Sequence, residues 1–155
     1  MSKTPKKSAT LTPDELKRVG DLCLLQGGGK KRLADLLCNG LECGSYATFG
    51  VDTEGYVAPK PEDLFKLDPE DQHVYRHIQY PMSKGGSASL YCRYDEEEGE
   101  EDRRFTLDLP ALKRGLAILS LDYPRVFADW VKENDDALTG DALLQCALLG
   151  EVVYG

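Results

Sequence analysis

The sequence has no apolar run that approaches the ~20 residues needed to span a membrane. Its first residues are basic, but no apolar stretch follows them as it would in a secretion signal. Internal repeats are also missing. With 155 residues, of which 41% are hydrophobic and 30% charged, the chain has the composition of one globular domain.

The cysteine content gives no disulfide framework. The chain has five cysteines, an odd number, and a chain of this length can bury enough surface to fold without bridges. We therefore expect reduced thiols and a cytoplasmic protein.

Histidine is scarce, which limits metal binding and nucleophilic catalysis. His73 and His77 are the only two, and with Cys38 and Cys43 they form a possible set of four zinc ligands. The Cys–x₄–Cys spacing is at the edge of the usual range, so a turn cysteine pair and two surface histidines are the favoured interpretation. No histidine lies near a candidate nucleophile in the sequence. We expect no bound metal, no cofactor and no enzyme activity.

One short segment has the composition of an anion site. A glycine turn, 27–29, leads into the basic residues Lys30, Lys31 and Arg32 at a helix start. The spacing and the Ser/Thr of a P-loop are missing. The favoured interpretation is a helix stop followed by a solvated basic turn, and we expect no direct binding of nucleic acid.

Helix and strand signals predict an α+β fold. A capping box at Thr12 starts a helix that ends at 27–29, and a second helix fits 30–37. Residues 38–60 are rich in turn residues, with a possible third strand at 45–50, and strands at 87–94 and 103–107 form a hairpin. Helices follow from Asp108, from Pro124 and from a cap at Thr139. The prediction is a small antiparallel sheet packed against N-terminal and C-terminal helices, within a single domain at 11–155 after a disordered tail at 1–10.

Negative charge is concentrated in the second half of the chain. The net charge is −8, and residues 95–155 carry 15 acidic against 6 basic residues. The densest run, 95–102, forms the predicted hairpin tip, and a second group lies on the helix from Pro124 and the link after it. A solubilising role is the alternative to a binding role for both groups. The candidate partner-binding residues are Asp95, Glu96, Glu97, Glu98, Glu100, Glu101, Asp102, Asp129, Glu133, Asp135 and Asp136.

The C-terminal third contains a recognisable series of motifs at 107–116, at Tyr123-Pro124 with 127–129, and at 134–137. The series continues through Thr139-Gly140-Asp141, Gln145 and 148–155, and a glycine-tyrosine element lies nearer the N-terminus at 44–46. On these residues the chain resembles a family of small, uncharacterised bacteriophage and prophage proteins. The resemblance implies a phage-related origin and a fold, but it implies no particular catalytic activity.

Charge and resemblance together suggest a hypothesis for function. An acidic protein can occupy a basic groove that normally binds nucleic acid. We therefore expect a non-enzymatic phage or mobile-element protein that inhibits a host defence complex, a CRISPR effector being one candidate, in the cytoplasm of a bacterial host. The alternative is a phage structural or assembly protein that acts through self-association or a virion partner.

Overall fold

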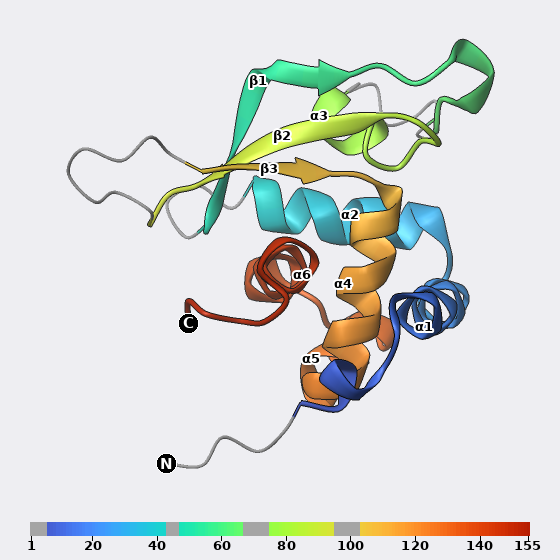
Figure 1. The fold of residues 1–155 in the computed structure, drawn as a ribbon, viewed down its shortest axis with the longest axis vertical. Helices are drawn as coiled ribbons and strands as arrows, with labels where there is room; N and C mark the ends of the chain where they lie inside the picture. Colours follow the sequence, from blue (N-terminus) through green and yellow to red (C-terminus); the bar gives the residue numbers. More distant parts are fainter. Residues whose placement is uncertain (1–5, 43–46, 67–74, 95–102) are drawn as a thin grey trace.

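A computed structural model describes residues 6–42, 47–66, 75–94 and 103–155. A three-stranded sheet lies against a layer of helices, and this confirms the predicted α+β class (Figure 1). The helices that pack on one another are α1 (Pro13–Gln26), α2 (Lys30–Leu41), α4 (Leu109–Asp122), α5 (Pro124–Val131) and α6 (Ala137–Leu149). Between β1 and β2 lie a short 3₁₀ helix, η3 (Pro61–Asp63), and one helical turn, α3 (Arg76–Gln79).

The strand order is β1-β2-β3, and both pairs are antiparallel. The predicted hairpin is confirmed, since β2 (Ser87–Cys92) pairs with β3 (Arg104–Leu107) with Leu90 opposite Phe105. The possible third strand predicted at 45–50 exists, but it overlaps the observed strand only at Phe49 and Gly50. β1 spans Phe49–Val57 and so occupies residues whose glycines and acids predicted turns.

Close approach between strands explains the glycines of β1. A Cβ on Gly50 would overlap the ring of Tyr91, and one on Gly55 would overlap the side chain of Ser89. Both partners belong to β2, so these glycines allow contact with the neighbouring strand. The register also shifts between Asp52 and Val57, which accommodates an irregular stretch within the strand.

The core lies between the sheet and the helices and continues among the helices themselves. α2 packs on α6, and α4 packs on both α1 and α6. Leucines supply most of the large side chains with no measurable exposure, and Trp130 is the largest of them. Other such residues are Phe49, Leu33, Leu37, Leu90, Leu107, Leu112, Leu116, Leu119 and Leu143.

α2 is longer than the predicted 30–37 because Asn39 and Gly40 continue the helix instead of turning the chain. A Cβ on Gly40 would lie 2.7 Å from the carbonyl carbon of Gly140 on α6. The two helices therefore meet backbone to backbone at this pair. The sequence signal of Asn-Gly for a turn is overridden by this packing.

The helix caps agree with the sequence in three of four cases. Thr12 forms the predicted capping box with Glu15, Asp108 caps α4, and Gly150 ends α6 with φ +79°. The predicted cap at Thr139 is wrong. Asp136 is the cap of α6, and Thr139 completes its capping box from the third helical position.

The N-terminal segment is ordered over the part that the structure describes. Lys7–Thr10 form a short 3₁₀ helix, η1, instead of a disordered tail. Ser8 is buried, and both its backbone N–H and its hydroxyl donate to the carboxylate of Asp122 at the end of α4. Lys6 also pairs with Glu151, so this segment is tied to the end of the chain.

Candidate functional site

The acidic run Asp95–Asp102, the main predicted contact, lies outside the described residues. The residues that bound it are described. Tyr91 of β2 pairs with Arg104 of β3, so the strands on either side of the run are neighbours in the sheet. The ring of Tyr94, just after β2, stacks on that of Tyr154 with centroids 4.7 Å apart. The end of the chain therefore lies beside the point where the acidic run begins.

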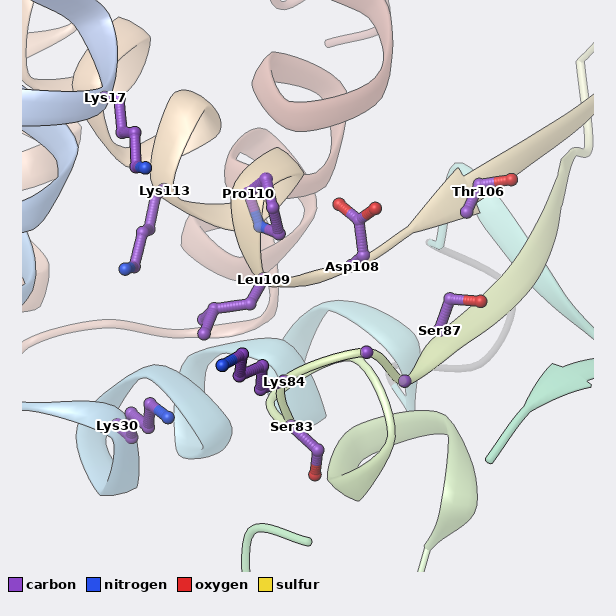
Figure 2. Close-up of a pocket in the computed structure, with 12 residues that line it drawn as sticks. Lys17, Lys30, Ser83, Lys84, Ser87, Thr106, Asp108, Leu109, Pro110 and Lys113 are labelled. Carbon is purple, nitrogen blue, oxygen red and sulfur yellow. The ribbon is translucent and has the colours of Figure 1, made fainter. Parts of the chain in front are cut away.

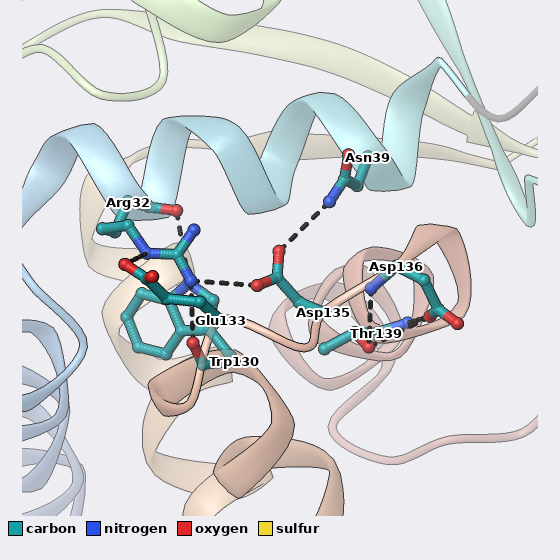
Figure 3. Close-up of polar contacts among 7 residues, drawn as sticks. All are labelled: Arg32, Asn39, Trp130, Glu133, Asp135, Asp136 and Thr139. Carbon is teal, nitrogen blue, oxygen red and sulfur yellow. Dashed lines mark hydrogen bonds and ion pairs between the residues drawn. The ribbon is translucent and has the colours of Figure 1, made fainter.

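The second acidic group divides into exposed and engaged residues (Figure 3). Asp129 is exposed, and the side chain of Glu133 is 76% exposed. The carboxylate of Asp135 is only 6% exposed, because one oxygen pairs with Arg32 at 2.9 Å and the other accepts from Asn39 at 3.1 Å. Asp135 therefore holds α2 to the link between α5 and α6.

Asp136 is also engaged within the molecule. Its carboxylate accepts from the backbone N–H of Thr139 at 3.0 Å, and the Thr139 hydroxyl accepts from the backbone N–H of Asp136 at 3.2 Å. Of the four predicted contacts in this group, Asp129, Glu133 and Asp136 are exposed residues, and the carboxylate of Asp136 is used as the helix cap. Asp129 lies on α5, and Glu133 lies in the link after it, 3.9 Å from the guanidinium of Arg32.

The basic turn was expected to be solvated, but Arg32 is built into the fold. Its guanidinium donates to the carbonyl oxygen of Trp130 at 2.8 Å, and the indole Nε1 of Trp130 donates to the carbonyl oxygen of Arg32 at 3.2 Å. A Cβ on Gly27 would overlap the same indole ring. The glycine turn thus has a packing role beside Trp130.

Two of the four possible zinc ligands come together around one carboxylate. The thiol of Cys38 lies 3.1 Å from Glu42, and Nε2 of His77 lies 3.3 Å from the other oxygen of Glu42. Burial, together with the hydrogen bond to Glu42, raises the pKa of the Cys38 thiol to about 12. Cys43 and His73 lie outside the described residues, and within the described ranges no cluster of three or more His, Cys, Asp or Glu suits a metal ion.

Two further thiols are held in the protonated form. Burial raises the pKa of Cys23, and it raises the pKa of Cys146 to about 12. Thiolate chemistry needs a lowered thiol pKa. These two cysteines behave as small apolar residues of the core.

The pattern that carries the family resemblance has structural roles. Asp141 accepts from the backbone N–H and the hydroxyl of Thr48 at 2.7 and 2.6 Å. Gln145 donates to Asp141 at 2.8 Å and accepts from the backbone N–H groups of Val153 and Tyr154 at 2.7 and 2.8 Å. This network, which we call the tail clamp (Thr48, Asp141 and Gln145), fixes the end of the chain against α6.

A cavity on another face was not predicted. It has a volume of about 660 Å³, and its lining includes four lysines from four parts of the chain: Lys17, Lys30, Lys84 and Lys113 (Figure 2). The sequence identified only Lys30 as part of an anion site. The other three are separated by tens of residues, and only the packing of α1, α2 and α4 brings them together.

Comparisons with family models, with curated proteins and with solved structures found no match to the chain. Across the described segments, none of the helices is long and apolar enough to cross a membrane.

Proposed function

We propose that the protein is a non-enzymatic phage or mobile-element protein that binds and inhibits a host nucleic-acid-handling complex. A defence complex, such as a CRISPR effector, is one candidate target. The acidic run 95–102 would occupy a basic groove of the partner, with carboxylates where phosphates normally lie. The resemblance of the C-terminal third to phage and prophage proteins supports this origin.

The observation that carries the proposal is the position of the acidic run. Seven carboxylates in eight residues separate β2 and β3, which are paired neighbours in the sheet. A short neutral turn would connect such strands with less repulsion between charges. Arg103 and Arg104, which follow the run, offset only part of its charge.

Capture from a host lysate with the protein tagged at its N-terminus, followed by mass spectrometry, identifies the partner. The decisive variant then changes five glutamates of the run to glutamine. We expect slower association and a flatter dependence of binding on salt, because electrostatic steering acts mainly on the association rate. The fold should be intact or slightly more stable. The residues changed are Glu96, Glu97, Glu98, Glu100 and Glu101.

A control with matched charge separates a specific contact from the effect of net charge. One variant changes Glu96, Glu97 and Glu98 to glutamine. The other neutralises three exposed acids elsewhere by Asp14→Asn, Glu54→Gln and Glu62→Gln. Only the first should slow association. If the five-residue variant binds with wild-type rate and salt dependence, the run is not the contact, and Asp129→Asn with Glu133→Gln becomes the next test.

The alternative, a structural or assembly protein that self-associates, is favoured by one observation. Leu22 and Leu25, three residues apart on α1, are 66% and 77% exposed. Apolar association persists in high salt, unlike binding through the acidic run. Light scattering at 1 M salt, on the order of ten times a typical buffer, tests this, and a monomer under those conditions would exclude it.

A further inference from the structure

The lysine-lined cavity lies where α1, α2 and α4 meet the loop that leads into β2. Lys17 comes from α1, Lys30 from α2, Lys84 from the loop and Lys113 from α4 (Figure 2). The volume of about 660 Å³ is within the range of small-molecule sites. Several elements therefore contribute charge of one sign to one solvent-open cavity.

Little negative charge balances these lysines. Lys113 pairs with Asp21 at 2.8 Å. Within the part of the chain that the structure describes, Lys17, Lys30 and Lys84 form no ion pair, and Asp108 is the one carboxylate in the lining. Like charges in a confined space repel one another, and a bound anion relieves this repulsion.

The start of α2 adds to the positive field beside Lys30. Gly29, the cap residue, has no side chain to accept from the first N–H groups of this 12-residue helix. Gly28 and Gly29 have φ of +100° and +88°, so a capping side chain would be strained at either position. The positive end of the helix dipole therefore has no side-chain acceptor.

The other end of the cavity has a different chemistry. Figure 2 shows the hydroxyls of Ser87 and Thr106 and the carboxylate of Asp108 on the side away from the lysines. One oxygen of Asp108 accepts from the backbone N–H of Ala111 at 2.9 Å. Hydroxyls and a carboxylate suit a neutral group that both donates and accepts hydrogen bonds, such as a ribose or another sugar.

We propose that this cavity binds a small organic polyphosphate, such as a nucleoside 5′-triphosphate. The phosphates lie against Lys17, Lys30, Lys84 and Lys113, and the hydroxyl-bearing part lies toward Ser87, Thr106 and Asp108. The site does not involve the acidic run, so the test of this proposal is independent of the test of the proposed inhibition of a host complex.

Isothermal titration with a nucleoside 5′-triphosphate, without added metal, tests the proposal. The variant Lys30→Gln with Lys84→Gln removes two charges from the cavity, and Lys60→Gln with Lys132→Gln removes two exposed charges elsewhere. Because a phosphate loses charge-assisted hydrogen bonds only in the first variant, we expect affinity to fall about tenfold or more there and to be unchanged in the control. Circular dichroism confirms that each variant is folded.

The end of the cavity that carries Ser87 and Thr106 is tested with two further ligands and one variant. The unphosphorylated nucleoside should not bind measurably, and inorganic tripolyphosphate should bind more weakly than the nucleoside triphosphate. Thr106→Val should weaken the nucleoside triphosphate and leave tripolyphosphate unaffected. Three results would overturn the proposal: no saturable binding to the wild type, equal loss in the two lysine variants, or tripolyphosphate that binds as tightly as the nucleotide.

Discussion

Among single residues, Arg32 shows how one side chain connects separate parts of the fold. It bonds to the backbone of α5, pairs with Asp135 in the following link, and accepts from the indole of Trp130 through its own carbonyl oxygen. The sequence placed Arg32 in a solvated turn and Asp135 on a binding surface. In the structure the two residues pair instead, and each neutralises the other at a partly buried junction.

Trp130→Ala should destabilise the protein by about 3–5 kcal/mol, because the indole is fully buried and its removal leaves a large cavity. Urea unfolding followed by circular dichroism measures the change. Leu138→Ala, at a side chain that is 65% exposed on α6, is the control and should change stability little. Equal stability of the two variants would contradict the burial of Trp130.

Arg32→Met should destabilise the protein by about 3 kcal/mol, because it leaves the carboxylate of Asp135 nearly buried without its cation. Asp135→Asn in the same chain should recover part of this loss, since the uncompensated charge is removed. A double-mutant cycle of unfolding free energies measures the coupling. Strictly additive effects would mean that the pair does not interact in solution.

At the scale of elements, glycines lie where neighbouring helices or strands approach each other closely. Gly40 and Gly140 let α2 and α6 touch, and Gly50 and Gly55 let β1 lie against the side chains of β2. In each case the glycine is required by a neighbour that is distant in the sequence.

Gly140→Ala should destabilise the protein by about 1–3 kcal/mol or more, because the added methyl group meets backbone atoms of Gly40 and Leu36, which cannot rotate away. Thermal unfolding measures the effect. Gly155→Ala, where a Cβ meets no atom within 4 Å, is the control and should be neutral. A neutral result at Gly140 would mean that the two helices lie further apart.

Gln145→Leu should release the last residues of the chain, because the N–H groups of Val153 and Tyr154 lose their acceptor. The expected loss of stability is about 1–3 kcal/mol. Hydrogen exchange at these two amides should accelerate, while Gln26→Leu at the exposed end of α1 should leave it unchanged. Unaltered protection of both amides would show that the tail clamp does not hold the tail.

The elements that were predicted correctly are those whose sequence signals lie within a few residues of one another. The capping residues Thr12 and Asp108 and the hairpin 87–107 were identified because their signals lie within a few residues. The full extent of β1 and the last turn of α2 were missed because Gly40, Gly50 and Gly55 have the same sequence signature in a turn as in a close contact. The cavity was missed for a similar reason, because Lys17, Lys84 and Lys113 have no common local pattern.

At the scale of the whole molecule, opposite charges occupy separate places. The chain carries a net charge of −8, yet one cavity is lined by four lysines, while the exposed acids Asp129 and Glu133 lie on α5 and on the link after it. Such separation produces local fields of both signs at physiological salt, where screening acts over ~8 Å. The two proposals therefore concern different surfaces and different ligands.

Elemental analysis of the purified protein should find no zinc. Zinc binds the thiolate form of cysteine, and the pKa of Cys38 is raised to about 12 beside Glu42, so loading at neutral pH requires an unfavourable loss of a proton. About one zinc per chain would contradict this expectation. Cys38, Cys43, His73 and His77 would then be the ligands to substitute.

The tail clamp has a practical consequence for experiments on the protein. Residues 152–154 are bonded to Tyr123 and Gln145, and Tyr154 stacks on Tyr94 close to the start of the acidic run. An affinity handle or a fluorophore attached after Gly155 would start beside this stack and compete with any partner that docks there. Surface-based binding measurements should therefore attach the protein at a site other than its last residues.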